Sequence, residues 1–171
     1  MRRAFAFVAA LGLVLVVAAP AAAGGRPEII RLEPTILDED FFAGTCDFRM
    51  ELVDQSTNSK LLVFPPESDG SQLTRSTGGY VSTVTNLDTG ASITVGYYAK
   101  IDFDAQADGS QVIQTSGAVL VYVWEGDDLS VFDPGLYLVT GSIHSIVGPD
   151  GFALEPERVK GKVVDLCDAL S

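Results

Sequence analysis

The segment SITVGYYAKIDF, residues 92–103, places an apolar side chain at every second position. The apolar positions run from Ile93 to Phe103, and the residues between them are polar, glycine or tyrosine. An α-helix would scatter such positions around its circumference, whereas a β-strand places them all on one face. The segment therefore predicts a long, half-buried strand, and it directs the fold towards antiparallel sheets.

The rest of the chain follows the same pattern. Residues 46–53 (CDFRMELV) and 136–147 (LYLVTGSIHSIV) also alternate, and turn sequences rich in Asp, Gly, Ser and Pro separate such segments. Residues 118–124 are apolar on both faces, as in a covered strand, and Gly117 before them indicates a bulge or a bend. About eight strands are expected from these patterns, with one helical turn at the end of the chain.

Consecutive hairpins form a meander, which hides its apolar face by closing into a barrel or by folding into a sandwich. The positions of Cys46 and Cys167 bear on this choice, because they lie near the first and the last expected strands. A bond between them is easiest where the two edges of the sheet meet. We therefore expect an all-β antiparallel meander closed into a barrel, with a β-sandwich as the alternative.

The N-terminal residues have the pattern of a secretory signal peptide. Arg2 and Arg3 precede an uncharged apolar run over residues 4–19, and small residues follow at 21–23. A retained anchor helix is the alternative, because the run is close to the lower limit for a membrane span. We expect residues 1–23 to be a signal peptide and the product to be secreted, with no membrane attachment after cleavage.

Export gives the two cysteines a role, because thiols tend to pair outside the cytosol. We therefore expect a disulfide between Cys46 and Cys167, since a metal site needs more ligands than two distant thiols and one histidine. Residues 24–45 contain Pro27 and Pro34 and are expected to form an extended leader. Residues 46–171 are expected to form a single β-barrel-like domain.

The charge of the chain argues against two classes of partner. It carries 11 basic and 23 acidic residues, a formal net charge of −12. Without Arg2 and Arg3 the balance becomes 9 − 23 = −14. Such a surface repels phosphate groups, and no basic cluster interrupts it, so nucleic acid and anionic membranes are not expected partners. The charge also serves solubility, which is sufficient to explain it.

Acidic residues form only weak metal-site candidates. The segment DAQADGS spaces its acidic residues as a calcium-binding EF-hand loop does, but Thr115 stands where the loop needs a glutamate. A hairpin turn explains this segment, and a solvated loop explains the acidic segment WEGDDLS. No cofactor is expected. The candidates are Asp104, Asp108, Glu125, Asp127 and Asp128.

No catalytic residue can be assigned. His144 is the only histidine, and neither a nucleophile elbow, a zinc-protease motif nor a glycine-rich phosphate loop accompanies it. Four aromatic residues are more informative, because they share one parity on neighbouring long strands and would line one end of a barrel interior. Ordinary core packing also explains them. They are Tyr97, Phe103, Tyr122 and Trp124.

Residues 46–170 resemble a family of small secreted proteins that is frequent in high-GC Gram-positive bacteria. The resemblance rests on the cysteine that opens the first strand, the hairpin TNLDTGASITV, the segment PGLYLVTGSI and the ending GKVVDLCDAL. It implies a disulfide-bearing β domain and no particular activity.

We expect an exported, non-enzymatic β-barrel that binds a small apolar ligand or a cell-envelope component. One alternative is a cavity-based isomerase or cyclase, similar in architecture to the allene oxide cyclase-like barrels. Another is a structural or interaction module. Buried polar groups in a cavity would favour the enzyme, and a filled, dry interior would favour the module. The sequence does not predict the oligomeric state.

Overall fold

The structure is a computed structural model that describes residues 25–125, 131–149 and 158–171. The expected signal peptide, Asp127 and Asp128 lie outside the described residues. No helix within the described ranges is long and apolar enough to cross a membrane. The described elements are β1 (Glu28–Arg31), β2 (Ile36–Leu37), β3 (Met50–Thr57), β4 (Lys60–Val63), β5 (Gln72–Asn86), β6 (Ser92–Ala105), β7 (Gln111–Val123), β8 (Gly135–Val147), β9 (Arg158–Asp165) and α1 (Leu166–Leu170).

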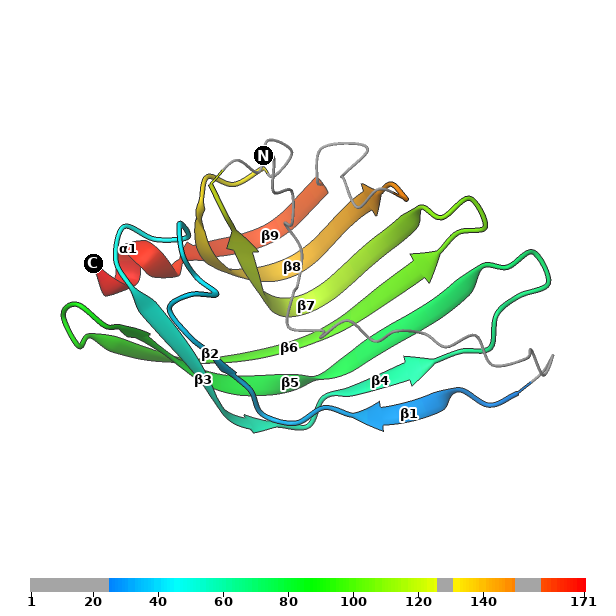
Figure 1. Cartoon of the computed structure of the whole chain (residues 1–171), viewed down its shortest axis with the longest axis horizontal. Helices are drawn as coiled ribbons and strands as arrows, with labels where there is room; N and C mark the ends of the chain where they lie inside the picture. Colours follow the sequence, from blue (N-terminus) through cyan, green and yellow to red (C-terminus); the bar gives the residue numbers. More distant parts are fainter. Residues whose placement is uncertain (1–24, 126–130, 150–157) are drawn as a thin grey trace.

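The strands form one antiparallel sheet, in which β5 to β9 follow one another as neighbours (Figure 1). β4 pairs with the first half of β5 and β3 with the second half, so these two short strands together occupy one position in the sheet. Residues 72–86 form the single strand β5. The predicted all-β meander is confirmed.

The segment expected to be an extended leader contributes two strands. β1 pairs with β4, where Ile30 lies opposite Leu61, and β2 pairs with β3, where Leu37 lies opposite Leu52. These strands form one edge of the sheet, and β9 forms the other. Within the described ranges no pairing joins β9 to β1 or β2.

A row of very small residues crosses five strands of the sheet. Pairing places the members of this row side by side on β5 to β9. We call it the glycine row, and along it the sheet bends without side chains colliding. Figure 1 shows the resulting curvature of the sheet. The row consists of Gly78, Ala99, Gly117, Gly141 and Gly161.

The sheet splits where the glycine row passes from β6 to β7. β7 pairs with β6 only up to Gly117, opposite Ala99, and residues 118–123 pair with β8 alone. Gly117 has a φ of +113°, which confirms the predicted bend at this residue. In Figure 1 the end of β7 rises away from β6.

The segment between β2 and β3, residues 38–49, packs against this end of β7, and we call it the plug segment. Its Phe42 is only 2% exposed, and the backbone oxygen of Phe41 accepts a 3.1 Å hydrogen bond from Nε1 of Trp124. Phe42 belongs to a core cluster that also includes side chains from β3, β5, β6, β7, β8 and α1. Apolar residues of the plug segment therefore cover this part of the core, as a further strand could otherwise do.

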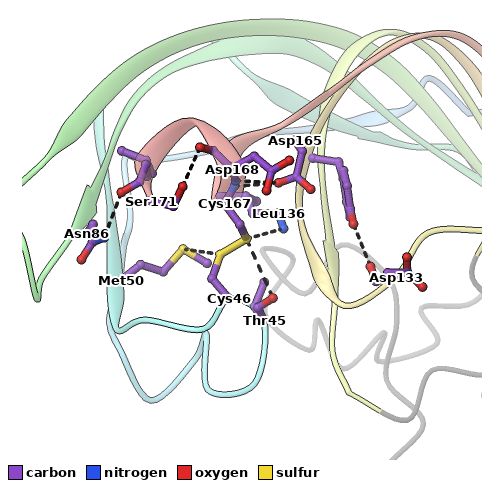
Figure 2. The surroundings of a disulfide bond; sticks show 12 residues. Thr45, Cys46, Met50, Asn86, Asp133, Leu136, Asp165, Cys167, Asp168 and Ser171 are labelled. Atoms are coloured by element: carbon purple, nitrogen blue, oxygen red, sulfur yellow. Dashed lines mark hydrogen bonds between the residues drawn. A yellow bond between two sulfur atoms is a disulfide. The ribbon is translucent and has the colours of Figure 1, made fainter.

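The predicted disulfide between Cys46 and Cys167 is confirmed, and it joins the plug segment to α1 (Figure 2). The two Cα atoms are 5.7 Å apart. Cys46 does not open a strand as expected, because β3 begins only at Met50. Asp165 caps α1, since its Oδ1 accepts hydrogen bonds from the backbone N–H groups of Cys167 and Asp168. The bond thus fastens the plug segment to the chain end, and it does not connect two edge strands.

Asn86, at the end of β5, connects the hairpin that follows it with α1. Its side chain is 2% exposed, and its Nδ2 donates a 2.9 Å hydrogen bond to the backbone oxygen of Leu170. Its Oδ1 accepts hydrogen bonds from the backbone N–H groups of Asp88 and Thr89. A buried side-chain amide thus satisfies both its donor and its acceptor groups at this junction.

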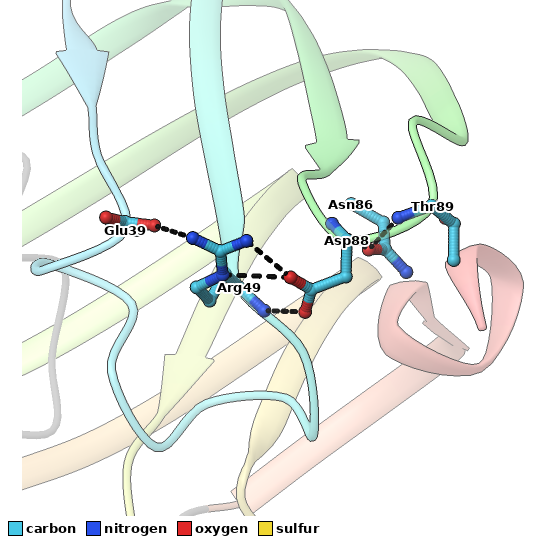
Figure 3. A network of polar contacts seen from close by, with 5 residues as sticks. All are labelled: Glu39, Arg49, Asn86, Asp88 and Thr89. Atoms are coloured by element: carbon cyan, nitrogen blue, oxygen red, sulfur yellow. Dashed lines mark hydrogen bonds and ion pairs between the residues drawn. The ribbon is translucent and has the colours of Figure 1, made fainter.

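Arg49, at the end of the plug segment, connects it with the same hairpin (Figure 3). Its side chain contacts Asp88 at 2.8 Å and Glu39 at 3.4 Å. The hydrogen bond from the backbone N–H of Arg49 lowers the pKa of Asp88, and the guanidinium adds to this effect. All three side chains are largely exposed, so water screens the contacts, and the buried residues carry most of the attachment.

Candidate functional site

A partly open pocket lies where β3, β5 and β6 face the rising end of β7. The cavity volume is about 70 Å³. This exceeds the roughly 10–15 Å³ that a single water molecule needs, so the pocket admits a small group of several non-hydrogen atoms. One wall is apolar, and it includes Leu37, Leu52, Ala99, Ile101, Val119 and Leu120.

The glycine row makes room for this pocket. Gly78 and Ala99 are paired members of the row, and both line the cavity. A Cβ atom on Gly78 would lie 2.5 Å from the Cα of Ser59, which shows how closely the connection between β3 and β4 approaches. Two members of the glycine row therefore contribute to the lining of the pocket beside the bend.

The other end of the pocket is polar and is centred on Asp54. Asp54 lies opposite Ser82 in the pairing of β3 with β5. The hydroxyl of Ser82 donates a 2.6 Å hydrogen bond to Oδ1 of Asp54, and the backbone N–H of Thr35 donates a 3.0 Å bond to Oδ2. A β-bulge after Asp54 shifts the register of β3 at this point. Two neighbouring segments thus hold the carboxylate in place.

Tyr97 extends this network. Its hydroxyl lies 3.1 Å from Oγ of Ser82. The single hydroxyl hydrogen of Ser82 goes to Asp54, so the hydroxyl of Tyr97 is the donor in this second bond. The result is a chain of hydrogen bonds from Tyr97 through Ser82 to Asp54. Towards the pocket, Tyr97 and Asp54 both offer oxygen lone pairs.

Two further tyrosines surround the polar end. Tyr80 lies opposite Tyr97, and their rings are stacked with centroids 5.5 Å apart. Tyr122 lines the pocket from β7, and its hydroxyl has no hydrogen-bond partner among the described residues. Burial raises the pKa of all three phenols, and it does so most strongly for Tyr97 and Tyr122. They therefore keep their protons at neutral pH.

No basic side chain within the described ranges forms an ion pair with Asp54. The carboxylate is only partly exposed, and its hydrogen-bond partners Ser82 and Thr35 are neutral donors. A carboxylate that lacks a positively charged partner attracts a cation. The polar end of the pocket therefore combines the negative charge of Asp54 with the aromatic rings of three tyrosines that line the same pocket.

The structure separates the four aromatic residues that the sequence suggested as lining. Tyr97 and Tyr122 lie in the pocket. Phe103 packs against a second core cluster that contains Ile113, on the other side of the glycine row. Trp124 lies against the plug segment, with its ring centroid 5.6 Å from that of Phe41. Shared parity did not bring the four together, because Phe103 lies further along β6, beyond Ala99 of the glycine row, and Trp124 follows the end of β7.

Three of the acidic candidates lie within the described residues. Asp104 is exposed near the end of β6, and Glu125 is exposed after β7. Asp108 lies in the hairpin turn, where hydrogen bonds from the hydroxyl and backbone N–H of Ser110 lower its pKa. Within the described ranges no group of three or more His, Cys, Asp or Glu side chains is arranged to hold a metal ion.

His144 lies on β8, opposite Gln114 and Arg158, and it does not line the pocket.

Three residues of the site were not predicted from the sequence: Asp54, Ser82 and Tyr80. The polar residues that follow Asp54 in the sequence indicate a turn, so the sequence pattern does not show that Asp54 belongs to β3. Ser82 and Tyr80 occupy every second position with Val84 on β5, and this alternation was the available signal.

Comparisons with known protein families, with curated proteins and with solved structures found no match. The chain is a disulfide-bearing, all-β antiparallel protein. The resemblance to a family of secreted bacterial proteins stays a prediction.

Proposed function

We propose that this protein is an exported, non-enzymatic binding protein that holds a small, largely apolar molecule in the pocket at the glycine row. The observation that carries this proposal is the pairing of an apolar wall with one polar end around Asp54. Ligand pockets commonly have this composition, in which apolar surface supplies affinity and a few polar groups fix the orientation.

The size of the pocket limits the ligand. A volume of about 70 Å³ admits a small molecule, or the terminal group of a larger envelope component that enters through the opening. The disulfide between Cys46 and Cys167 is consistent with export, because such bonds persist in oxidising compartments. Closure of the sheet into a complete barrel stays a prediction, and the proposed binding does not require it.

Native mass spectrometry of the protein secreted into culture medium tests this proposal. A retained molecule of low mass, released on denaturation, is the expected result. Protein without a retained molecule should then be screened against small amines, alcohols and acids by thermal shift, because a ligand that binds only the folded state raises the melting temperature. Failure of both measurements would contradict a binding function.

The hydrogen-bond chain from Tyr97 through Ser82 to Asp54 favours a second candidate, an isomerase or cyclase that moves protons within the pocket. Burial raises the pKa of Tyr97, however, and an efficient acid–base catalyst has a pKa near the working pH. Binding therefore ranks first. Incubation of the loaded protein in D₂O separates the two, because only catalysed proton transfer at carbon introduces C–D bonds into the recovered molecule.

A further inference from the structure

The oxygen lone pairs at the polar end of the pocket restrict which ligand groups can bind there. Asp54 is an acceptor only, and the hydroxyl of Tyr97 already donates its hydrogen to Ser82. A ligand group that lies against both residues must therefore supply the hydrogen itself. This requirement admits amines and alcohols, and it disfavours ionised acids.

The charge of Asp54 distinguishes between these donors. Its two oxygens accept hydrogen bonds from Ser82 and Thr35, and neither partner carries a positive charge. A protonated amine would neutralise the carboxylate and form a charge-assisted hydrogen bond, which is roughly twice as strong as a bond between neutral groups. A neutral alcohol would leave the charge of Asp54 uncompensated.

The aromatic rings point to the same chemistry. Tyr80, Tyr97 and Tyr122 line the same pocket as Asp54, and the rings of Tyr80 and Tyr97 are stacked on each other. The face of an aromatic ring carries partial negative charge and attracts ammonium groups. The acidic balance of the chain, 23 acidic against 11 basic residues, adds attraction at longer range.

We propose that the pocket selects small molecules, or terminal groups, that carry a protonated amine next to a short apolar portion. The amine lies against Asp54 and Tyr97, and the apolar portion lies against the wall that Leu52, Ile101 and Leu120 help to form. This inference rests on the proposed binding function and names the class of ligand for the same pocket.

Three probes of similar shape test the selection: isoamylamine, isoamyl alcohol and isovalerate, each with about six or seven non-hydrogen atoms, as the volume allows. Isothermal titration of the secreted, disulfide-bonded protein at neutral pH gives their dissociation constants. We expect the amine to bind at least about tenfold more tightly than the alcohol, and the acid to bind most weakly.

D54N should remove this preference, with a loss of amine affinity of about tenfold or more and little change for the alcohol. D104N is the matched control, because Asp104 is exposed on β6 and does not line the pocket, so the same charge change should leave the amine affinity unaltered. If D54N does not fold, the comparison of the three probes on the unaltered protein decides the question.

The outcomes separate the two proposals. If none of the probes binds and the culture-derived protein retains no molecule, the binding function itself is wrong. If the alcohol or the acid binds as tightly as the amine, or if D54N keeps the preference for the amine, the pocket is a binding site and the assigned ligand class is wrong.

Discussion

Gly141 provides the strictest test of how the sheet is built. It belongs to the glycine row and lies between Gly117 on β7 and Gly161 on β9. Its φ of +151° is in a region that residues with a side chain rarely adopt. A Cβ atom there would lie 2.8 Å from the Cα of Gly161 and closer still to the backbone oxygen of Lys160. Gly141→Ala therefore forces the two strands apart.

The expected cost has two parts. The unfavourable backbone conformation costs about 1–3 kcal/mol, and the forced shift of the neighbouring backbone costs a further 1–3 kcal/mol or so. The free energy of unfolding should therefore fall by roughly 2–6 kcal/mol, out of a typical total of about 5–15 kcal/mol.

Gly96→Ala is the matched control, because it makes the same chemical change in the same sheet. A Cβ atom on Gly96 would have no neighbouring atom within 4 Å, and Gly96 lies outside the positive-φ set. Alanine is favoured over glycine within a strand by about 0.5–1 kcal/mol, so this variant should be neutral or slightly more stable. Urea unfolding, followed by the fluorescence of Trp124, measures both variants. Equal effects of the two substitutions would refute the role assigned to the glycine row.

Two further predictions concern the disulfide and one ion pair. The bond between Cys46 and Cys167 closes a loop with a sequence separation of 121. In the chain-entropy model, C46A/C167A should therefore lower the free energy of unfolding by about 5 kcal/mol. A loss below about 1 kcal/mol in urea unfolding would contradict this. The side-chain hydrogen bond from Arg75 lowers the pKa of Asp102. The pair therefore stabilises the fold at pH values above the ordinary pKa of Asp, and this stabilisation is lost as the pH falls through the lowered pKa. D102N should therefore cost about 1–2 kcal/mol at neutral pH and progressively less in acid, and a cost that does not change with pH would exclude the ion pair as its source.

Local alternation was sufficient to predict the class of the fold. The strand around Ile93 to Phe103 and the bend at Gly117 both depend on near neighbours in the chain, and both are present. The disulfide followed from the expected compartment and from the presence of two cysteines. These inferences needed no knowledge of which strands pair.

Features that depend on pairing could not be read from the sequence. The glycine row exists only because the register aligns Gly117, Gly141 and Gly161 across three strands. The polar end of the pocket likewise requires Asp54 to lie opposite Ser82. The alternation around Cys46 predicts a strand there, whereas the apolar residues around it fill the core as part of the plug segment.

Binding of a small amine at Asp54, in the pocket beside the glycine row, is tested most directly by a titration with isoamylamine. The titration is followed through the backbone amide resonances of the isotope-labelled protein. We expect the largest shifts at Thr35 and Gly78, which line the pocket, and at Ser82, which donates a hydrogen bond to Asp54. Shifts centred on Tyr98, which is 60% exposed on the opposite face of β6, or no shifts at any amine concentration, would contradict it.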